Sequence, residues 1–134
     1  MKRVFKTRYF HRWARKSGLT DRALCSAVAE MQAGLIDADL GGGVVKKRVP
    51  LPGRGKSGST RTLVATNRGD RWFFIFGFAK NERDNVSTRE LEGLQAIAAD
   101  LLELAHTELD AHVESEALQE ICRDCEDQDD QPNA

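Results

Sequence analysis

Cationic side chains stand on both sides of a dense apolar segment in the middle of the chain. Residues 71–79 read RWFFIFGFA, and Lys80 and Arg83 follow them. Lys56 and Arg61 precede the segment, Lys56 within a glycine-rich stretch. A guanidinium can donate two parallel hydrogen bonds to a phosphate, and an ammonium adds a point charge. Cations fixed at the end of a buried strand therefore predict an anion-binding site.

Further cations lie earlier, on a predicted strand over residues 44–51 and in the loop after it: Lys46, Lys47, Arg48 and Arg54. Neighbouring strands of a meander would bring several of these cations to one face. Two structural alternatives remain open. Arg83 could pair with Glu82 or Asp84, and the cations of residues 44–51 could protect a strand edge.

The GRGKS segment at residues 53–57 is similar to a phosphate-binding P-loop but lacks its pattern. The motif G-x-x-x-x-G-K-[ST] would need glycine at position 50, where Pro50 stands. The segment also lies between two predicted strands, whereas a P-loop opens a helix. We therefore exclude nucleotide triphosphate binding by this loop.

Charge divides the chain into a basic body and an acidic end. Residues 1–89 carry 19 Lys or Arg against 7 Asp or Glu, and residues 90–134 carry 1 against 14. The body is as basic as a nucleic-acid binder. The chain has no apolar run of the roughly 20 residues that span a bilayer and no signal-peptide pattern at its start, so we expect a cytoplasmic location.

Hydrophobic periodicity predicts a single α+β domain. The expected elements are a strand over 3–8, helices over 9–17 and 21–33, strands over 44–51, 60–67 and 71–79, and a helix from a Ser87–Glu90 capping box to about residue 105. The last three strands should form an antiparallel meander, and 71–79 should be a central strand of the sheet, covered on both faces. We expect a domain over 1–106, a short helical extension over 107–122 and an acidic, disordered tail over 123–134.

The aromatic side chains of the central strand are more typical of a core than of a base-stacking surface: Trp72, Phe73, Phe74, Phe76 and Phe78. Cys25 lies on a helical apolar stripe and is predicted to be a small buried side chain. Cys122 and Cys125 form a lone C-x-x-C, which lacks the second ligand pair of a zinc site and the strand–helix setting of a redox motif. We expect neither a metal nor a cofactor.

Three ordered segments carry a family resemblance: GLIDADLGGGVVKKRV at 34–49, GRGKSGSTRTLV at 53–64 and FGFAKNERDN at 76–85. Together they resemble the RelE/HigB toxins of type II toxin–antitoxin systems, and the short RelE-like branch with the KNERDN signature most of all. The likeness covers about residues 3–105.

The resemblance implies a small mixed sheet with helices packed on it and an endoribonuclease that cuts mRNA, usually in the ribosomal A site. In this family the RNA 2′-hydroxyl attacks the adjacent phosphate, cations stabilise the transition state, and no metal is required. The implied partners are mRNA, the ribosome and a cognate antitoxin, often a helix-turn-helix protein from the adjacent gene, in a hetero-oligomer. Same-fold gyrase poisons and non-catalytic RNA- or protein-binding members are the alternative.

The resemblance also assigns roles to residues. Arg61 matches the strand arginine that contacts the scissile phosphate, and Lys80 and Arg83 lie in the K-x-E-R segment of the active site. Lys56 is a further catalytic candidate. RNA backbone contacts fall to the earlier cations: Lys46, Lys47, Arg48 and Arg54.

One position departs from the family pattern. Some relatives carry a tyrosine four residues after the second motif arginine, where this chain has Ser87. Ser87 is typical of a helix cap, so the proton-transfer residue stays unassigned. Lys56, Lys80 and His11 are the candidates for that role.

Overall fold

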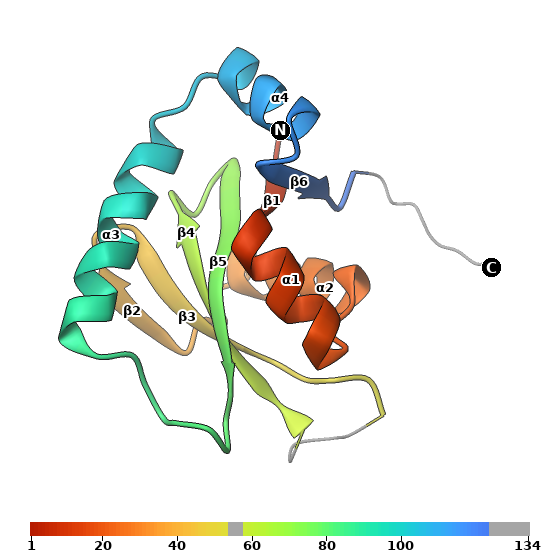
Figure 1. The fold of residues 1–134 in the computed structure, drawn as a ribbon, viewed down its shortest axis with the longest axis vertical. Coiled ribbons are helices and arrows are strands. Elements are labelled where there is room, and N and C mark those ends of the chain that lie inside the picture. The colour runs from red at the N-terminus through yellow and green to blue at the C-terminus, as the bar shows by residue number, and fades with distance from the viewer. Residues whose placement is uncertain (54–57, 124–134) are drawn as a thin grey trace.

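The computed structural model describes residues 1–53 and 58–123 and has the predicted α+β architecture (Figure 1). Its elements in chain order are β1 (Arg3–Thr7), α1 (Arg8–Ser17), α2 (Asp21–Gln32), β2 (Ala38–Gly41), β3 (Val44–Val49), β4 (Thr60–Thr66), β5 (Arg71–Ala79), α3 (Thr88–Leu102), α4 (His106–Glu114) and β6 (Leu118–Ile121). Arg54, Lys56, Cys125 and the predicted disordered tail from residue 124 onward lie outside the described residues.

The six strands form one sheet in the order β2-β3-β4-β5-β1-β6. The predicted meander is confirmed, because β3, β4 and β5 pair antiparallel in sequence order. Strand β1 joins β5 in parallel and pairs antiparallel with β6 on its other side. The apolar β5 therefore lies in the middle of the sheet, which explains why its side chains are apolar on both faces.

Helices cover both faces of the sheet (Figure 1). Helices α1 and α2, predicted over residues 9–17 and 21–33, pack on one face as a helical hairpin, where Trp72 and Phe74 of β5 join a core with Phe10 and Leu24. Helices α3 and α4 pack on the other face, where Phe73 meets side chains of both helices. The expected capping box starts α3, since Ser87 accepts from the Glu90 backbone and Glu90 accepts from the Ser87 backbone.

Three predictions need correction. Residues 38–41 form an edge strand that the sequence pattern did not indicate, so β3 is not an edge and its cations do not protect one. Residues 118–121, placed in a helical extension, form strand β6 and pair with β1. Cys25 is disulfide-bonded to Cys122 instead of being a reduced buried side chain.

The sheet approaches α1 closely at Gly77. A Cβ atom at this position would lie 2.3 Å from Cζ3 of Trp13, well inside van der Waals contact. The Trp13 ring packs in turn against Phe10, at 5.4 Å between ring centroids. A side chain at position 77 would therefore force the indole or the strand to shift.

We expect Gly77→Ala to lower the free energy of unfolding by about 1–3 kcal/mol, the usual cost of overpacking a core. Urea unfolding followed by Trp fluorescence measures this change. Gly93→Ala on α3 is the matched control, because a Cβ there meets no atom within 4 Å, and alanine favours a helix over glycine. Equal stability of the two variants would contradict the close approach.

Candidate functional site

Cations of two neighbouring strands share the face of the sheet that carries α3. Leu63 of β4 packs in the core with α3 and lies opposite Lys46 of β3. Arg61, two residues before Leu63, points to the same face because side chains alternate along a strand. Arg48 is its partner in the register on β3, and Phe78 is its partner on β5. Lys46, Arg48 and Arg61 therefore lie together and form a cationic face of the sheet.

Arg83 reaches this group from the segment after β5. Its Cζ atom lies 5.4 Å from the ring centroid of Phe76 and 5.3 Å from that of Phe78. Phe78 is also the register partner of Arg61, so Arg83 stacks on the residue that pairs with Arg61 in the sheet. Stacking on aromatic faces orients the planar guanidinium and holds it against the sheet.

The ion-pair partner of Arg83 is Glu90, which accepts from Nη1 at 2.9 Å, rather than Glu82 or Asp84. This hydrogen bond, followed by that from the Ser87 backbone, lowers the pKa of Glu90 below its ordinary value. Glu90 is therefore a carboxylate at neutral pH. Because Ser87 is the N-cap, the helix cap and Arg83 are joined through a single carboxylate.

Arg61 carries an unpartnered donor. Its Nη1 atom is shielded from solvent and has no hydrogen-bond acceptor within residues 1–53 and 58–123. A buried N–H without an acceptor is costly, so this atom favours an acceptor supplied from outside. Lys80 lies exposed directly after β5. Phosphate oxygens are acceptors of the kind that such a group of cations binds.

Lys47 does not join this face. As the neighbour of Lys46 and Arg48 on β3 it points to the other side of the sheet, where its side chain is 8% exposed. It forms an ion pair with Glu30 at 2.8 Å and donates to the Leu35 carbonyl at 2.9 Å. The prediction of a shared cationic surface therefore does not extend to Lys47, because alternation along the strand separates it from its neighbours.

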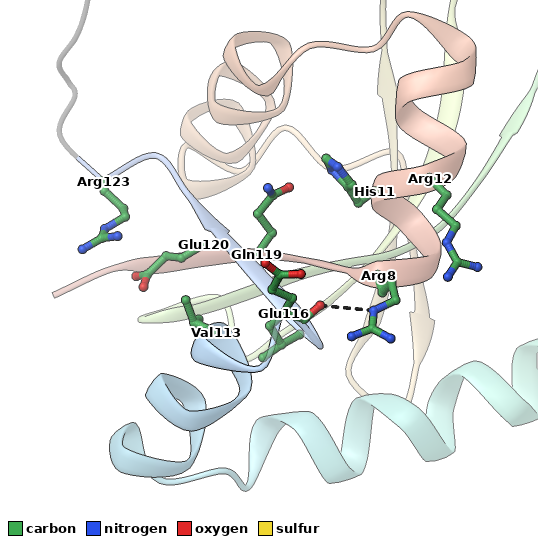
Figure 2. A pocket seen from close by; sticks show the side chains of 9 residues that line it. Arg8, His11, Arg12, Val113, Glu116, Gln119, Glu120 and Arg123 are labelled. Carbon is green, nitrogen blue, oxygen red and sulfur yellow. Dashed lines mark hydrogen bonds between the residues drawn. The ribbon is translucent and has the colours of Figure 1, made fainter.

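His11, a candidate for proton transfer, lies in a different place. It lines a pocket of about 510 Å³ between α1 and β6, together with other side chains of both elements (Figure 2). The lining comprises Arg8, His11, Arg12, Val113, Glu116, Leu118, Gln119, Glu120 and Arg123. Arg61, Lys80 and Arg83 are absent from that lining, so the structure does not bring His11 to the cationic face.

The environment of His11 predicts a pH dependence of stability. Burial, and then the charges of Lys6 and Arg15, lower the pKa of His11 below its ordinary value of 6.5, and Asp21 opposes them. The unfolded chain then binds a proton at a higher pH than the folded chain does. The free energy of unfolding should therefore fall as the pH drops through about 6.5. The contribution of His11 to this fall is complete once the pH lies below the pKa of His11 in the folded protein.

Urea titrations between about pH 7.5 and pH 5.5 measure this change, and His11→Gln should show a smaller loss than the wild type. Leu35→Ala, an exposed substitution that removes no titratable group, is the control and should keep the wild-type slope. A wild-type slope in His11→Gln would contradict the assignment.

Among the residues that the structure describes, no three His, Cys, Asp or Glu side chains gather in a way that could hold a metal ion. No helix in the described part of the chain is long and apolar enough to cross a bilayer.

Two side chains that adjoin the cationic face, Glu90 and Tyr9, were not predicted from the sequence. Glu90 has a visible signal, since the capping box places its carboxylate at the start of α3 beside the segment that carries Arg83. Tyr9 has none, because its position depends on the parallel pairing of β1 with β5. Its ring stacks on Phe76 with a centroid distance of 5.9 Å.

Comparison with protein families gives one match that spans nearly the whole chain. Residues 2–121 match the family described as the RelE toxin of the RelE/RelB toxin–antitoxin system. The chain belongs to the RelE toxin family. The match extends through α4 and β6, so the family pattern continues beyond residue 105, where the resemblance in the sequence motifs ended. A comparison with curated proteins gives no match.

Proposed function

We propose that this RelE toxin is a metal-independent endoribonuclease that cuts mRNA on the ribosome and so inhibits translation. The observation that carries the proposal is the convergence of Arg48, Arg61 and Arg83 on one face, with the Nη1 atom of Arg61 lacking an acceptor among the described residues. A phosphate of RNA offers the acceptor and the negative charge that this face lacks.

In the proposed reaction the RNA 2′-hydroxyl attacks the adjacent phosphorus. The O2′–P bond forms, the P–O5′ bond breaks, and the products are a 2′,3′-cyclic phosphate and a 5′-hydroxyl. Negative charge accumulates on the phosphorane oxygens, and Arg61 and Arg83 are placed to stabilise it. A base must take the 2′ proton and an acid must supply one to O5′. Lys80 and Lys56 are the proposed participants, with Arg54 a proposed backbone contact.

Glu90 partly neutralises the charge of Arg83 in the free protein. The ion pair occupies Nη1 of Arg83, and a guanidinium has further N–H donors for a phosphate. RNA binding therefore does not require the pair with Glu90 to break. We propose that Glu90 holds Arg83 in place for the substrate, with Lys46 and Arg48 binding the RNA backbone nearby.

We further propose a cytoplasmic location and a RelB-type antitoxin as partner, encoded next to the toxin and bound in a hetero-oligomer. Both follow from the family and from the substrate, because ribosomes and mRNA meet in the cytoplasm. A gyrase-poisoning or purely RNA- or protein-binding protein of the same fold is the competing function.

Primer extension on cellular transcripts after induction of the toxin separates these functions. We expect new 5′ ends within translated regions, at regular positions relative to codons, and their loss when translation of the reporter is prevented by a mutated start codon. Intact mRNA together with DNA breaks would instead indicate a gyrase poison. Intact mRNA and DNA would indicate a binding protein.

A further inference from the structure

Tyr9 is an exposed aromatic side chain placed against the cationic face. It is the only tyrosine of the chain, and 59% of its surface is exposed. Its ring lies nearly parallel to that of Phe76, with 2° between the planes and 5.9 Å between the centroids. Phe76 is itself only partly buried. A ring this exposed adds little to the core, so its stacking on Phe76 calls for another explanation.

The topology places Tyr9 here. Strand β1 runs parallel to β5 with Lys6 opposite Phe74, and Thr7 then caps α1. Tyr9 thus leaves the sheet in the first turn of α1, beside the end of β5 that leads to the site. Its ring, Phe76 and two side chains of α3, Leu94 and Ile97, line an apolar pocket of about 320 Å³ that Thr7 and Ile75 complete.

Cations continue the same surface. Phe76 lies within 6 Å of both the Tyr9 ring and the Arg83 guanidinium carbon. Phe78, on the same face of β5, also lies under Arg83 and is the register partner of Arg61 on β4. Along β5 the surface therefore passes from an exposed aromatic ring and an apolar pocket at Tyr9 to the two cations Arg83 and Arg61. A nucleotide has a flat apolar face and an adjoining phosphate, and matches both halves.

We propose that Tyr9 and Phe76 form the wall of a base-binding site for the nucleotide adjoining the phosphate held by Arg61 and Arg83. This inference rests on the proposed ribonuclease function and assigns to Tyr9 the positioning of the substrate. Stacking is available to every base, so the site would hold the RNA in register with little preference among bases. The hydroxyl of Tyr9 is not needed for stacking.

The test measures binding of full-length variants to ribosomes programmed with a short mRNA whose attacking 2′-hydroxyl is replaced by hydrogen, so that no cut occurs. Tyr9→Ala should weaken binding by about 5- to 100-fold, the usual effect of removing a stacking ring. Tyr9→Phe should bind like the wild type. Leu35→Ala is the matched control, since Leu35 is 60% exposed and outside this surface, and it should also bind like the wild type.

A scan with abasic nucleotides identifies the base. Wild type should lose affinity at one position next to the scissile phosphate, and Tyr9→Ala should be insensitive to the abasic site there. If Tyr9→Ala binds like wild type, or still loses affinity when the abasic site stands at any position, the base site is wrong. Cleavage of unmodified mRNA by the wild type and not by Arg61→Glu would then still support the nuclease. If Tyr9→Ala weakens only antitoxin binding, the surface belongs to a protein partner. If wild type binds no programmed ribosome, both proposals fail.

Discussion

Expression of the Arg61→Glu variant should no longer arrest growth, and its rate of mRNA cleavage should fall by at least about 10²–10³-fold, the loss seen when one donor to a transition-state anion is removed. Charge reversal adds repulsion of the phosphate to the loss of a donor. Arg61 pairs in the register with Arg48 on one side and with Phe78 on the other, and Arg83 stacks on Phe78.

The variant should keep its fold, because Nη1 of Arg61 donates to no acceptor in the described part of the chain. Circular dichroism and urea unfolding verify this point before activity is compared. Arg22→Glu is the matched charge reversal, on an exposed position of α2 at the opposite face of the sheet, and it should arrest growth as the wild type does. A folded Arg61→Glu protein that still arrests growth contradicts the assignment.

The second large effect concerns the disulfide between Cys25 of α2 and Cys122 after β6. The bond joins residues 97 positions apart, with 5.6 Å between their Cα atoms. It fixes the C-terminal edge strand to a helix on the face of the sheet away from the cationic site. We expect Cys122→Ser to lower the free energy of unfolding by about 2–5 kcal/mol in the oxidised protein, because a closed loop of this length restricts the unfolded chain strongly.

Urea unfolding with and without dithiothreitol measures the effect. Reductant should destabilise the wild type and leave Cys122→Ser unchanged. Cys125→Ser is the control and should behave like the wild type. A loss of stability in Cys125→Ser and none in Cys122→Ser would show that another pairing exists. Disulfides are rare in a reducing cytoplasm, so alkylation of thiols in intact cells would show whether the two cysteines are bonded there.

The central elements were predictable because their signals are local. The apolar run of residues 71–79 indicated a strand covered on both faces, and β5 lies between β4 and β1. The spacing of Ser87 and Glu90 predicted the start of α3, where both hydrogen bonds of the capping box are present. Arg61 and Arg83 were expected together, and Arg83 stacks on Phe78, the register partner of Arg61.

The remaining features depend on pairings that no local pattern encodes. Lys47 was grouped with Lys46 and Arg48, although strand alternation turns it toward Glu30 on the opposite face. Strand β6 has four residues, too few for periodicity to separate a strand from a helix. Tyr9 reaches Phe76 only because β1 joins the sheet parallel to β5, which brings distant parts of the sequence side by side.

We propose that this RelE toxin cuts mRNA by attack of the 2′-hydroxyl on a phosphate held by Arg61 and Arg83. Incubation of the purified protein with programmed ribosomes in the presence of a chelator, followed by analysis of the RNA ends, tests this reaction. We expect a 2′,3′-cyclic phosphate on one fragment and a 5′-hydroxyl on the other, with neither formed by Arg61→Glu. Uncut RNA, or fragments that carry a 5′-phosphate, would contradict it.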